Sequence, residues 1–245
     1  MVAHLGGDLI SRSEAKNWLA RAYMNAKSVV LSAGFGDEIT WQEQVNLDSL
    51  TEQDLLRESA WVILSAGMSE SIVRRRFPKI SESFFWWESA RNISRFSEAC
   101  CRLAVQHFNH PRKISAIAEV ARRIAAEGFE AIHKEILANP LVALQQFPFV
   151  GPVTVYHLAK NIGAPVAKPD RHLKRFAISF GYNDVQEFCR SISEQVGDSV
   201  QVVDIVLWRY ATLTRNQPSV STSSFPNRFR RTPSAITTQG NGRLT

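Results

Sequence analysis

The sequence has few cysteines and no long apolar run. Its three cysteines, Cys100, Cys101 and Cys189, are too few for a disulfide framework, and two of them are neighbours. They are typical of reduced thiols in the cytoplasm. No segment approaches the roughly 18 consecutive apolar residues of a membrane span, and the N-terminus lacks the basic start and apolar run of a signal peptide. We therefore expect a cytoplasmic protein without a membrane partner.

Acidic residues are absent from residues 216–245. The whole chain of 245 residues carries 29 Lys and Arg against 23 Asp and Glu, a net charge of +6. Because four of the arginines lie in residues 216–245, residues 1–215 hold 25 basic side chains and all 23 acidic ones. The terminal segment is also rich in Ser, Thr, Asn, Gln, Pro and Gly, which predicts a disordered basic tail. The near-neutral remainder does not by itself indicate a nucleic-acid partner.

Period-2 alternation of β-branched residues is nearly absent, so the sequence predicts an all-α fold. Hydrophobic residues make up 44% of the chain, enough for residues 1–215 to bury a core in two helical lobes. The apolar run from Val200 to Trp208 is longer than an ordinary strand and favours a buried helix. The pattern predicts helices at about 11–31, 51–67, 88–107, 112–127, 129–137, 141–147, 152–162, 171–180, 184–196 and 200–213.

The most informative segment is a predicted helix-hairpin-helix motif at about residues 141–163. Pro148 and Gly151 bracket a tight turn, and Pro152 suits the first position of the next helix. A hairpin that leads into a helix N-terminus points backbone amides outward, where they can bind an anion such as phosphate. Asp170 then stands at the start of a further predicted helix.

This segment resembles the helix-hairpin-helix (HhH-GPD) DNA glycosylase superfamily. The family pattern is Leu-Pro-Gly-Val-Gly-x-Lys-Thr/Val, then a helix, then a catalytic Asp that is often part of Asp-x-His. Here the hairpin reads Phe-Pro-Phe-Val-Gly-Pro-Val-Thr over residues 147–154, and Asp170 with His172 matches the second part. The upstream segments that fit are Leu55–Glu70 and Lys113–Leu137. The resemblance covers about residues 50–213 and implies a two-lobed, all-α glycosylase-like fold.

The resemblance also implies a reaction. The family turns a damaged or modified base out of double-stranded DNA into a pocket between the lobes. Asp170 would stabilise the oxocarbenium-like sugar and position the attacking water, so that hydrolysis leaves an abasic site. We expect a monomer that acts in the cytoplasm, at the nucleoid in a bacterium. No catalytic metal or other required cofactor is expected, although hairpin carbonyls in this family commonly hold a monovalent cation.

Particular residues acquire roles from the resemblance. The residues expected to contact the DNA backbone are Phe149, Gly151 and Thr154, through hairpin amides, and His172 and Lys168, through side chains. Met68 lies in the turn where the family places a residue that fills the gap in the duplex or lines the base pocket. Trp41 and Trp86 belong to an aromatic set able to stack on a flipped base.

Three departures from the family pattern bear on activity. Phe149 replaces the first hairpin glycine, where the backbone usually has a positive φ, and this predicts a distorted or weakened hairpin. Val153 stands where lyase members have a lysine, so no amine is available there to form a Schiff base. The enzyme is therefore expected to hydrolyse the base–sugar bond without lyase activity. No four-cysteine cluster follows the last predicted helix, which excludes the iron–sulfur branch.

The sequence leaves alternatives open. Asp170 is also a good N-cap residue for its helix, so a catalytically silent module that binds DNA or a partner is the competing interpretation. His172 also fits a plain helix surface, Lys168 also fits a solvated side chain or a substitute for the missing lysine, and Trp61 is expected in the core. The valine at 153 and the aromatic richness favour the branch of the family that excises alkylated bases. Another modified base, in repair or in defence against modified phage DNA, is the alternative.

Overall fold

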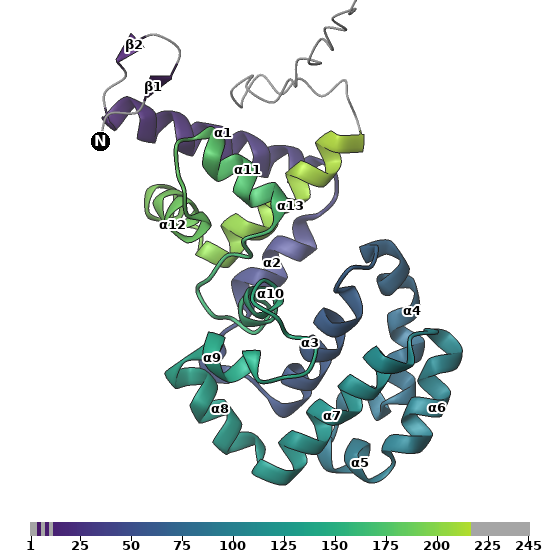
Figure 1. Cartoon of the computed structure of the whole chain (residues 1–245). Coiled ribbons are helices and arrows are strands. Elements are labelled where there is room, and N and C mark those ends of the chain that lie inside the picture. Colours follow the sequence, from purple (N-terminus) through teal and green to yellow (C-terminus); the bar gives the residue numbers. More distant parts are fainter. Residues whose placement is uncertain (1–3, 6–7, 10–11, 217–245) are drawn as a thin grey trace, which may run out of the picture.

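The structure, a computed structural model, describes residues 4–5, 8–9 and 12–216 and is almost entirely helical (Figure 1). Two strands of two residues each, β1 (His4–Leu5) and β2 (Asp8–Leu9), pair antiparallel near the N-terminus. The helices are α1 (Arg12–Ser32), α2 (Gly36–Gln44), α3 (Glu52–Ser65), α4 (Glu70–Ser83), α5 (Ala90–Arg95), α6 (Ser97–His107), α7 (Pro111–Glu127), α8 (Phe129–Ala138), α9 (Pro140–Gln145), α10 (Thr154–Asn161), α11 (Arg171–Ser179), α12 (Val185–Val196) and α13 (Val200–Asn216), with the short 3₁₀ helices η1 (Leu47–Ser49) and η2 (Phe85–Trp87). The predicted all-α fold is confirmed.

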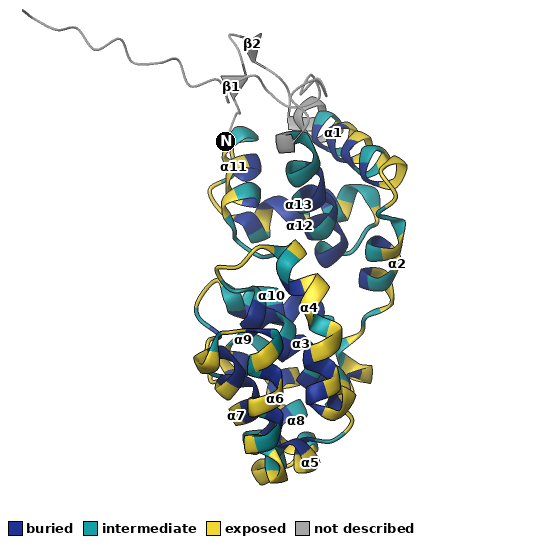
Figure 2. Ribbon diagram, turned by 90° about the vertical axis from the view of Figure 1, so that its right-hand side faces the viewer, coloured by how far each residue is buried: buried dark blue, intermediate teal, exposed yellow. Residues whose placement is uncertain are grey.

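Two hydrophobic clusters divide the described chain into two lobes. The larger cluster runs from Leu50 to Ala164 and joins α3 to α10. The smaller one combines residues 19–39 of α1 and α2 with residues 167–210 of α11 to α13. The chain therefore starts in the small lobe, builds the large lobe, and returns. Figures 1 and 2 show the two lobes with α2 and α10 near their junction, each lobe buried at its centre.

Local signals explain where most helices begin. Pro111 and Pro140 occupy the first positions of α7 and α9, and the residue before each caps the helix through its side chain. Thr51 caps α3, accepting a hydrogen bond from the Asp54 amide at 3.1 Å. The run from Val200 onward forms the start of α13, where Val202, Val203 and Val206 are buried. These starts follow the sequence prediction.

Two helices were not predicted, and one predicted helix is divided. The sequence gives no expected helix over α2 or α4, and the segment predicted at 88–107 forms α5 and α6, which meet at Phe96. The predicted tail began at residue 216, whereas Asn216 is the last residue of α13. The remainder of that predicted tail, residues 217–245, lies outside the described residues.

The chain returns toward the small lobe through a close backbone approach at Gly163. This residue has a φ of +100°, and a Cβ built on it would lie 2.5 Å from the amide nitrogen of Leu47. Only glycine fits both the positive φ and the contact. Gly163 therefore lets the end of α10 pack against the segment that leads into α3. The two connections between the lobes, from α2 to α3 and from α10 to α11, meet at this contact.

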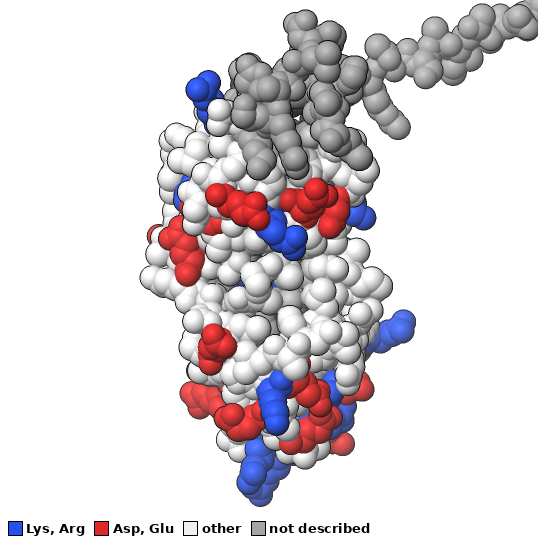
Figure 3. Space-filling view, turned by 90° about the vertical axis from the view of Figure 1, so that its left-hand side faces the viewer, with Lys and Arg blue, Asp and Glu red and all other residues white. Residues whose placement is uncertain are grey.

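The described part of the chain contains no helix long and apolar enough to cross a membrane. It also contains no group of three His, Cys, Asp or Glu side chains arranged to hold a metal ion. The face in Figure 3 carries basic and acidic side chains at both ends, with few charged residues between them. This face is therefore not a continuous basic surface.

Candidate active site

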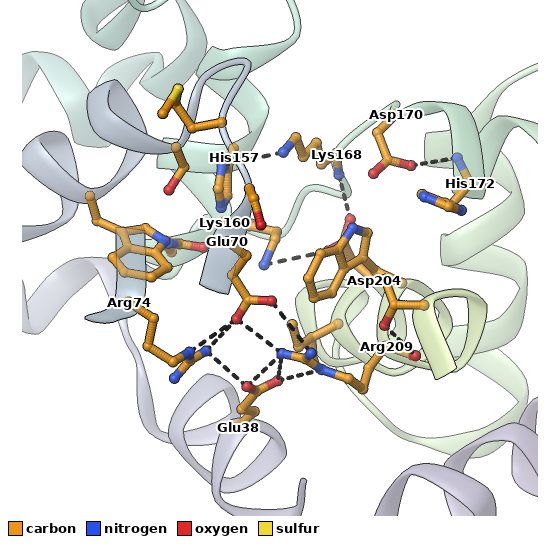
Figure 4. A pocket seen from close by; sticks show the side chains of 18 of the residues that line it. Glu38, Glu70, Arg74, His157, Lys160, Lys168, Asp170, His172, Asp204 and Arg209 are labelled. Carbon is orange, nitrogen blue, oxygen red and sulfur yellow. Dashed lines mark hydrogen bonds and ion pairs between the residues drawn. The ribbon is translucent and has the colours of Figure 1, made fainter. Parts of the chain in front are cut away.

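A cleft of about 1420 Å³ lies between the two lobes. The large lobe contributes the end of α3, the turn at residues 67–69, the start of α4 and one side of α10. The small lobe contributes α2, the segment at 168–172 and α13. Because both lobes line the cleft, its shape depends on the contacts that hold the two lobes together. Figure 4 shows charged side chains from both lobes turned into this space.

The predicted hairpin connects α9 to α10 beside the cleft. Phe149 adopts a φ of +61° despite its side chain, so the backbone keeps the left-handed conformation that glycine has in the family pattern. Its ring is 41% exposed and lies edge-on to the His110 ring. Within the described part of the chain, the amides of Gly151 and Thr154 donate no recorded hydrogen bond. These amides therefore remain available to an anion.

The hairpin reaches the cleft through Val153. This side chain is 41% exposed and lines the cleft, whereas Phe149, Gly151 and Thr154 do not. An apolar group thus occupies the place expected for the lyase lysine. Of the residues predicted to contact DNA, the hairpin residues Phe149, Gly151 and Thr154 lie outside the cleft. Lys168 and His172 line the cleft.

Asp170 is the N-cap residue of α11. Its Oδ1 accepts hydrogen bonds from the amides of His172 at 2.8 Å and Leu173 at 3.0 Å. Its Oδ2 accepts no recorded hydrogen bond from the described residues, and the side chain lines the cleft (Figure 4). One oxygen therefore caps the helix while the other stays available. The capping role and a catalytic role do not compete for the same atom.

Asp204 anchors the segment that carries Lys168 and Asp170. This buried carboxylate on α13 accepts a hydrogen bond from the Lys168 amide at 2.6 Å and lies 3.4 Å from the Lys160 ammonium. Burial raises the pKa of Asp204, and the charge on Lys160 opposes that rise. Gln42 on α2 accepts a hydrogen bond from the same ammonium at 3.2 Å. The two lobes thus share a buried polar contact beneath the cleft.

Four charged residues bridge the lobes at another side of the cleft. Arg209 on α13 contacts Glu38 on α2 at 2.6 Å and Glu70 on α4 at 3.3 Å. Arg74 on α4 contacts Glu38 at 3.1 Å and also pairs with Glu70 (Figure 4). Burial would raise the pKa of Glu70, but its hydrogen bonds and charge attraction to the two arginines outweigh this and lower it.

Aromatic side chains form part of the cleft wall. Trp41 and Met68 both line it, in the region where a base pocket was predicted. Trp86 does not line the cleft; it is 53% exposed on η2, and we no longer assign it to the base pocket. Trp61, expected in the core, is only partly buried and lines the cleft, with its ring edge-on to Phe77 at 5.2 Å between centroids. Trp61 packs against the core of the large lobe as expected, and it also reaches the cleft because one side of α3 faces that space.

Sequence reasoning missed several polar residues that line the cleft, namely Glu38, Glu58, Glu70, His157, Asp204 and Arg209. One signal was available for Asp204, because it is the only charged residue within the apolar run from Val200 to Trp208. A carboxylate buried in such a helix requires a partner. Nothing in the sequence spacing distinguishes the other five from residues of a solvated surface, although Glu58 and Arg209 are buried in the structure.

The fold has a counterpart among solved structures. No family model and no curated protein matches the sequence. The chain is similar to the crystal structure of the Methanocaldococcus jannaschii 8-oxoguanine glycosylase/lyase in complex with a 15mer DNA containing 8-oxoguanine. The match has a TM-score of 0.53 and 19% sequence identity and covers 77% of this chain and 96% of that chain. The chain has the fold of a helix-hairpin-helix DNA glycosylase.

Within that fold, Val153 at the end of the hairpin and Asp170 both line the interlobe cleft. The likeness at 19% identity concerns the fold, so the chemistry of the cleft is argued from its own residues.

Proposed function

We propose that the protein is a DNA N-glycosylase that excises a damaged or modified base. The base is turned out of double-stranded DNA into the cleft, and its bond to the sugar is hydrolysed to leave an abasic site. The observation that carries the proposal is the placement of Asp170, with one oxygen capping α11 and the other available at the cleft. The fold it shares with a glycosylase/lyase bound to DNA supports this proposal.

Each element of the site has a part in this reaction. The free amides of Gly151 and Thr154 bind a backbone phosphate next to the target nucleotide. Met68, Trp41 and the partly buried Trp61 offer surfaces against which the flipped base packs. As the bond to the base breaks, the Asp170 carboxylate stabilises positive charge on the sugar and accepts a proton from the attacking water.

The proposed reaction is hydrolytic, without a lyase step. Val153 presents an apolar side chain to the cleft where lyase members of the fold have a lysine. The similar solved structure is named a glycosylase/lyase, so this is a point on which the two chains are proposed to differ. We further propose that the protein acts as a monomer, because both lobes of one chain line the cleft.

The test of Asp170 uses duplexes that each carry one modified base, with abasic products revealed by alkali. Asp170→Asn keeps a side chain able to cap α11, so the fold is expected to survive while single-turnover excision falls by at least about 100-fold. Asp184→Asn is the control, because Asp184 also caps its helix, α12, through its side chain and does not line the cleft. Undiminished excision by the Asp170 variant would remove Asp170 from the mechanism.

The competing function is a module that binds DNA without excising anything. It is favoured by the capping bonds of Asp170, which alone give that residue a structural purpose. Tight binding to duplex DNA with no alkali-sensitive product from any modified base would support it. Trapping of the protein on an abasic duplex by borohydride would instead contradict the hydrolytic proposal, since trapping requires a Schiff base.

A further inference from the structure

Backbone hydrogen bonds of Lys168 and of the residue before it hold this segment in place. The Lys168 amide donates to Asp204, and the neighbouring Ala167 exchanges two hydrogen bonds with the Gln186 side chain, at 2.9 Å and at 2.5 Å. The Lys168 side chain is partly buried and lines the cleft, two residues before Asp170. Figure 4 shows its ammonium group directed toward His157 from the segment that carries Asp170. The backbone position of this lysine is therefore fixed, which limits the region that its side chain can reach.

The hydrogen-bond partner of Lys168 is a neutral ring. Its Nζ lies 3.3 Å from His157 Nδ1. An ammonium group has only donors, so Nδ1 accepts and the imidazole proton lies on Nε2. Burial, together with the charges on Lys168 and Lys160, lowers the pKa of His157 well below its ordinary value, which keeps the ring uncharged. The contact therefore orients Lys168 without neutralising its charge.

Lys168 also lacks the carboxylate partner that the other shielded cations of the cleft have. Lys160 pairs with Asp204, and Arg209 pairs with two glutamates. No carboxylate oxygen of the described residues lies within 4.0 Å of Lys168 Nζ. Burial lowers the pKa of Lys168, although Asp170 and Asp204 oppose this. Lys168 is thus an oriented proton donor that lies close to Asp170 in the chain and forms no ion pair with the described residues.

We propose that Lys168 is the general acid that protonates the departing base, and that the substrates are accordingly neutral modified bases. This inference rests on the proposed excision. When the bond between the sugar carbon and the base nitrogen breaks, its electron pair goes to the base. A neutral base would leave as an anion, so a proton from Lys168 converts it into a neutral product.

Asp170 takes up the proton that the attacking water releases. Water adds its oxygen to the sugar carbon and gives a proton to the Asp170 carboxylate. That proton returns through solvent to the Lys168 amine, so both residues end as they began. A cationic base, such as one alkylated on a ring nitrogen, already leaves as a neutral molecule and needs no acid. The presence of Lys168 therefore favours neutral substrates over the alkylated bases toward which the sequence leaned.

The experiment measures single-turnover excision from DNA duplexes, each of which carries one test base. The neutral bases are uracil, hypoxanthine, 8-oxoguanine and 5-hydroxymethylcytosine, and 7-methylguanine is the cationic comparison. Lys168→Met should slow excision of a neutral base by at least about 100-fold and abolish the loss of rate at alkaline pH that a lysine acid imposes. Lys168→Arg keeps the charge but gives up its proton poorly, so it should also be slow. Lys134→Met, on the exposed face of α8, is the control.

The results separate the possible uses of Lys168. Under the proposal, excision of 7-methylguanine and affinity for a duplex with a tetrahydrofuran abasic analogue change little in Lys168→Met. Equal slowing of neutral and cationic bases, or a loss of affinity as large as the loss of rate, would identify a phosphate contact and overturn the proposal. Borohydride trapping that depends on Lys168 would identify a nucleophile and also overturn it. Excision of 7-methylguanine alone would refute the substrate class, whereas no excision at all would refute the proposed function itself.

Discussion

Phe149 holds a backbone conformation that favours glycine. Its φ of +61° puts a bulky residue in the left-handed region, which costs an L-residue about 1 kcal/mol or more. Phe149→Gly and Phe149→Ala remove the same ring, but only the glycine relieves the backbone. We therefore expect the Gly variant to have a free energy of unfolding about 1 kcal/mol above that of the Ala variant, measured by urea denaturation. An Ala variant as stable as the Gly variant would show that no strain is stored at this turn.

Individual residues were predictable where their partners are near in sequence. The two amides that Asp170 caps lie two and three residues away, so its capping role follows from local pattern, whereas its proposed catalytic role comes from the resemblance of its segment to the glycosylase pattern. Asp204 contacts the Lys168 amide 36 residues away, and no local spacing reveals that contact. The same holds for Arg209, whose glutamate partners come from α2 and α4. Long-range partners decide the electrostatics of this cleft, which is why its motif could be predicted from the sequence and its charge network could not.

At the scale of elements, Lys113 on α7 closes the C-terminal end of α3. Its buried ammonium donates to the carbonyls of Leu64 at 2.8 Å and Ala66 at 2.5 Å, groups that have no partner within the helix. Those carbonyls immediately precede the turn that contains Met68. Replacing Lys113 by Met should destabilise the fold by about 2 kcal/mol, because it leaves one buried and one partly buried acceptor unsatisfied.

The measurement is urea denaturation beside Lys134→Met, which removes an exposed lysine from α8. Equal stability of the two variants would mean that water satisfies the α3 carbonyls without Lys113. Excision by the Lys113 variant at a temperature where it is folded then reports whether the position of the Met68 turn matters to the reaction.

The two unpredicted helices show what sequence patterns omit. α4 contains Pro78 in its interior and three consecutive arginines, features that indicate a break and a solvated segment. It nevertheless forms because Val73 and Ile80 are fully buried in the large lobe. α2 is short and begins at a glycine, and Ile39 secures it to the small lobe. Tertiary packing outweighs local propensity in both helices, and both line the cleft.

At the scale of the whole molecule, the ion pairs between α2, α4 and α13 contribute to holding the cleft together. Glu70 belongs to the large lobe, and its partner Arg209, which is only 10% exposed, belongs to the small lobe. Glu70→Gln keeps the size and hydrogen-bonding capacity of the side chain but removes its charge. At pH 7 the variant should be less stable than the wild type by about 1 kcal/mol, since one partner is shielded and the other partly exposed.

The pH dependence of that difference identifies its origin. The pKa of Glu70 is lowered in the folded protein from an ordinary 4.5, so its charge contributes fully above 4.5, where both folded and unfolded chains are ionised. Below 4.5 the unfolded chain takes up the proton first, and the contribution is lost as pH falls through the lowered pKa. Urea denaturation from pH 7 to about 3.5 should therefore show the wild type and Glu70→Gln converging in acid. Glu119→Gln, an exposed change on α7, should show no such trend. A gap that stays constant into acid would mean that Glu70 acts through packing, and that the lobes are held by their buried contacts at Lys160 and Asp204 instead.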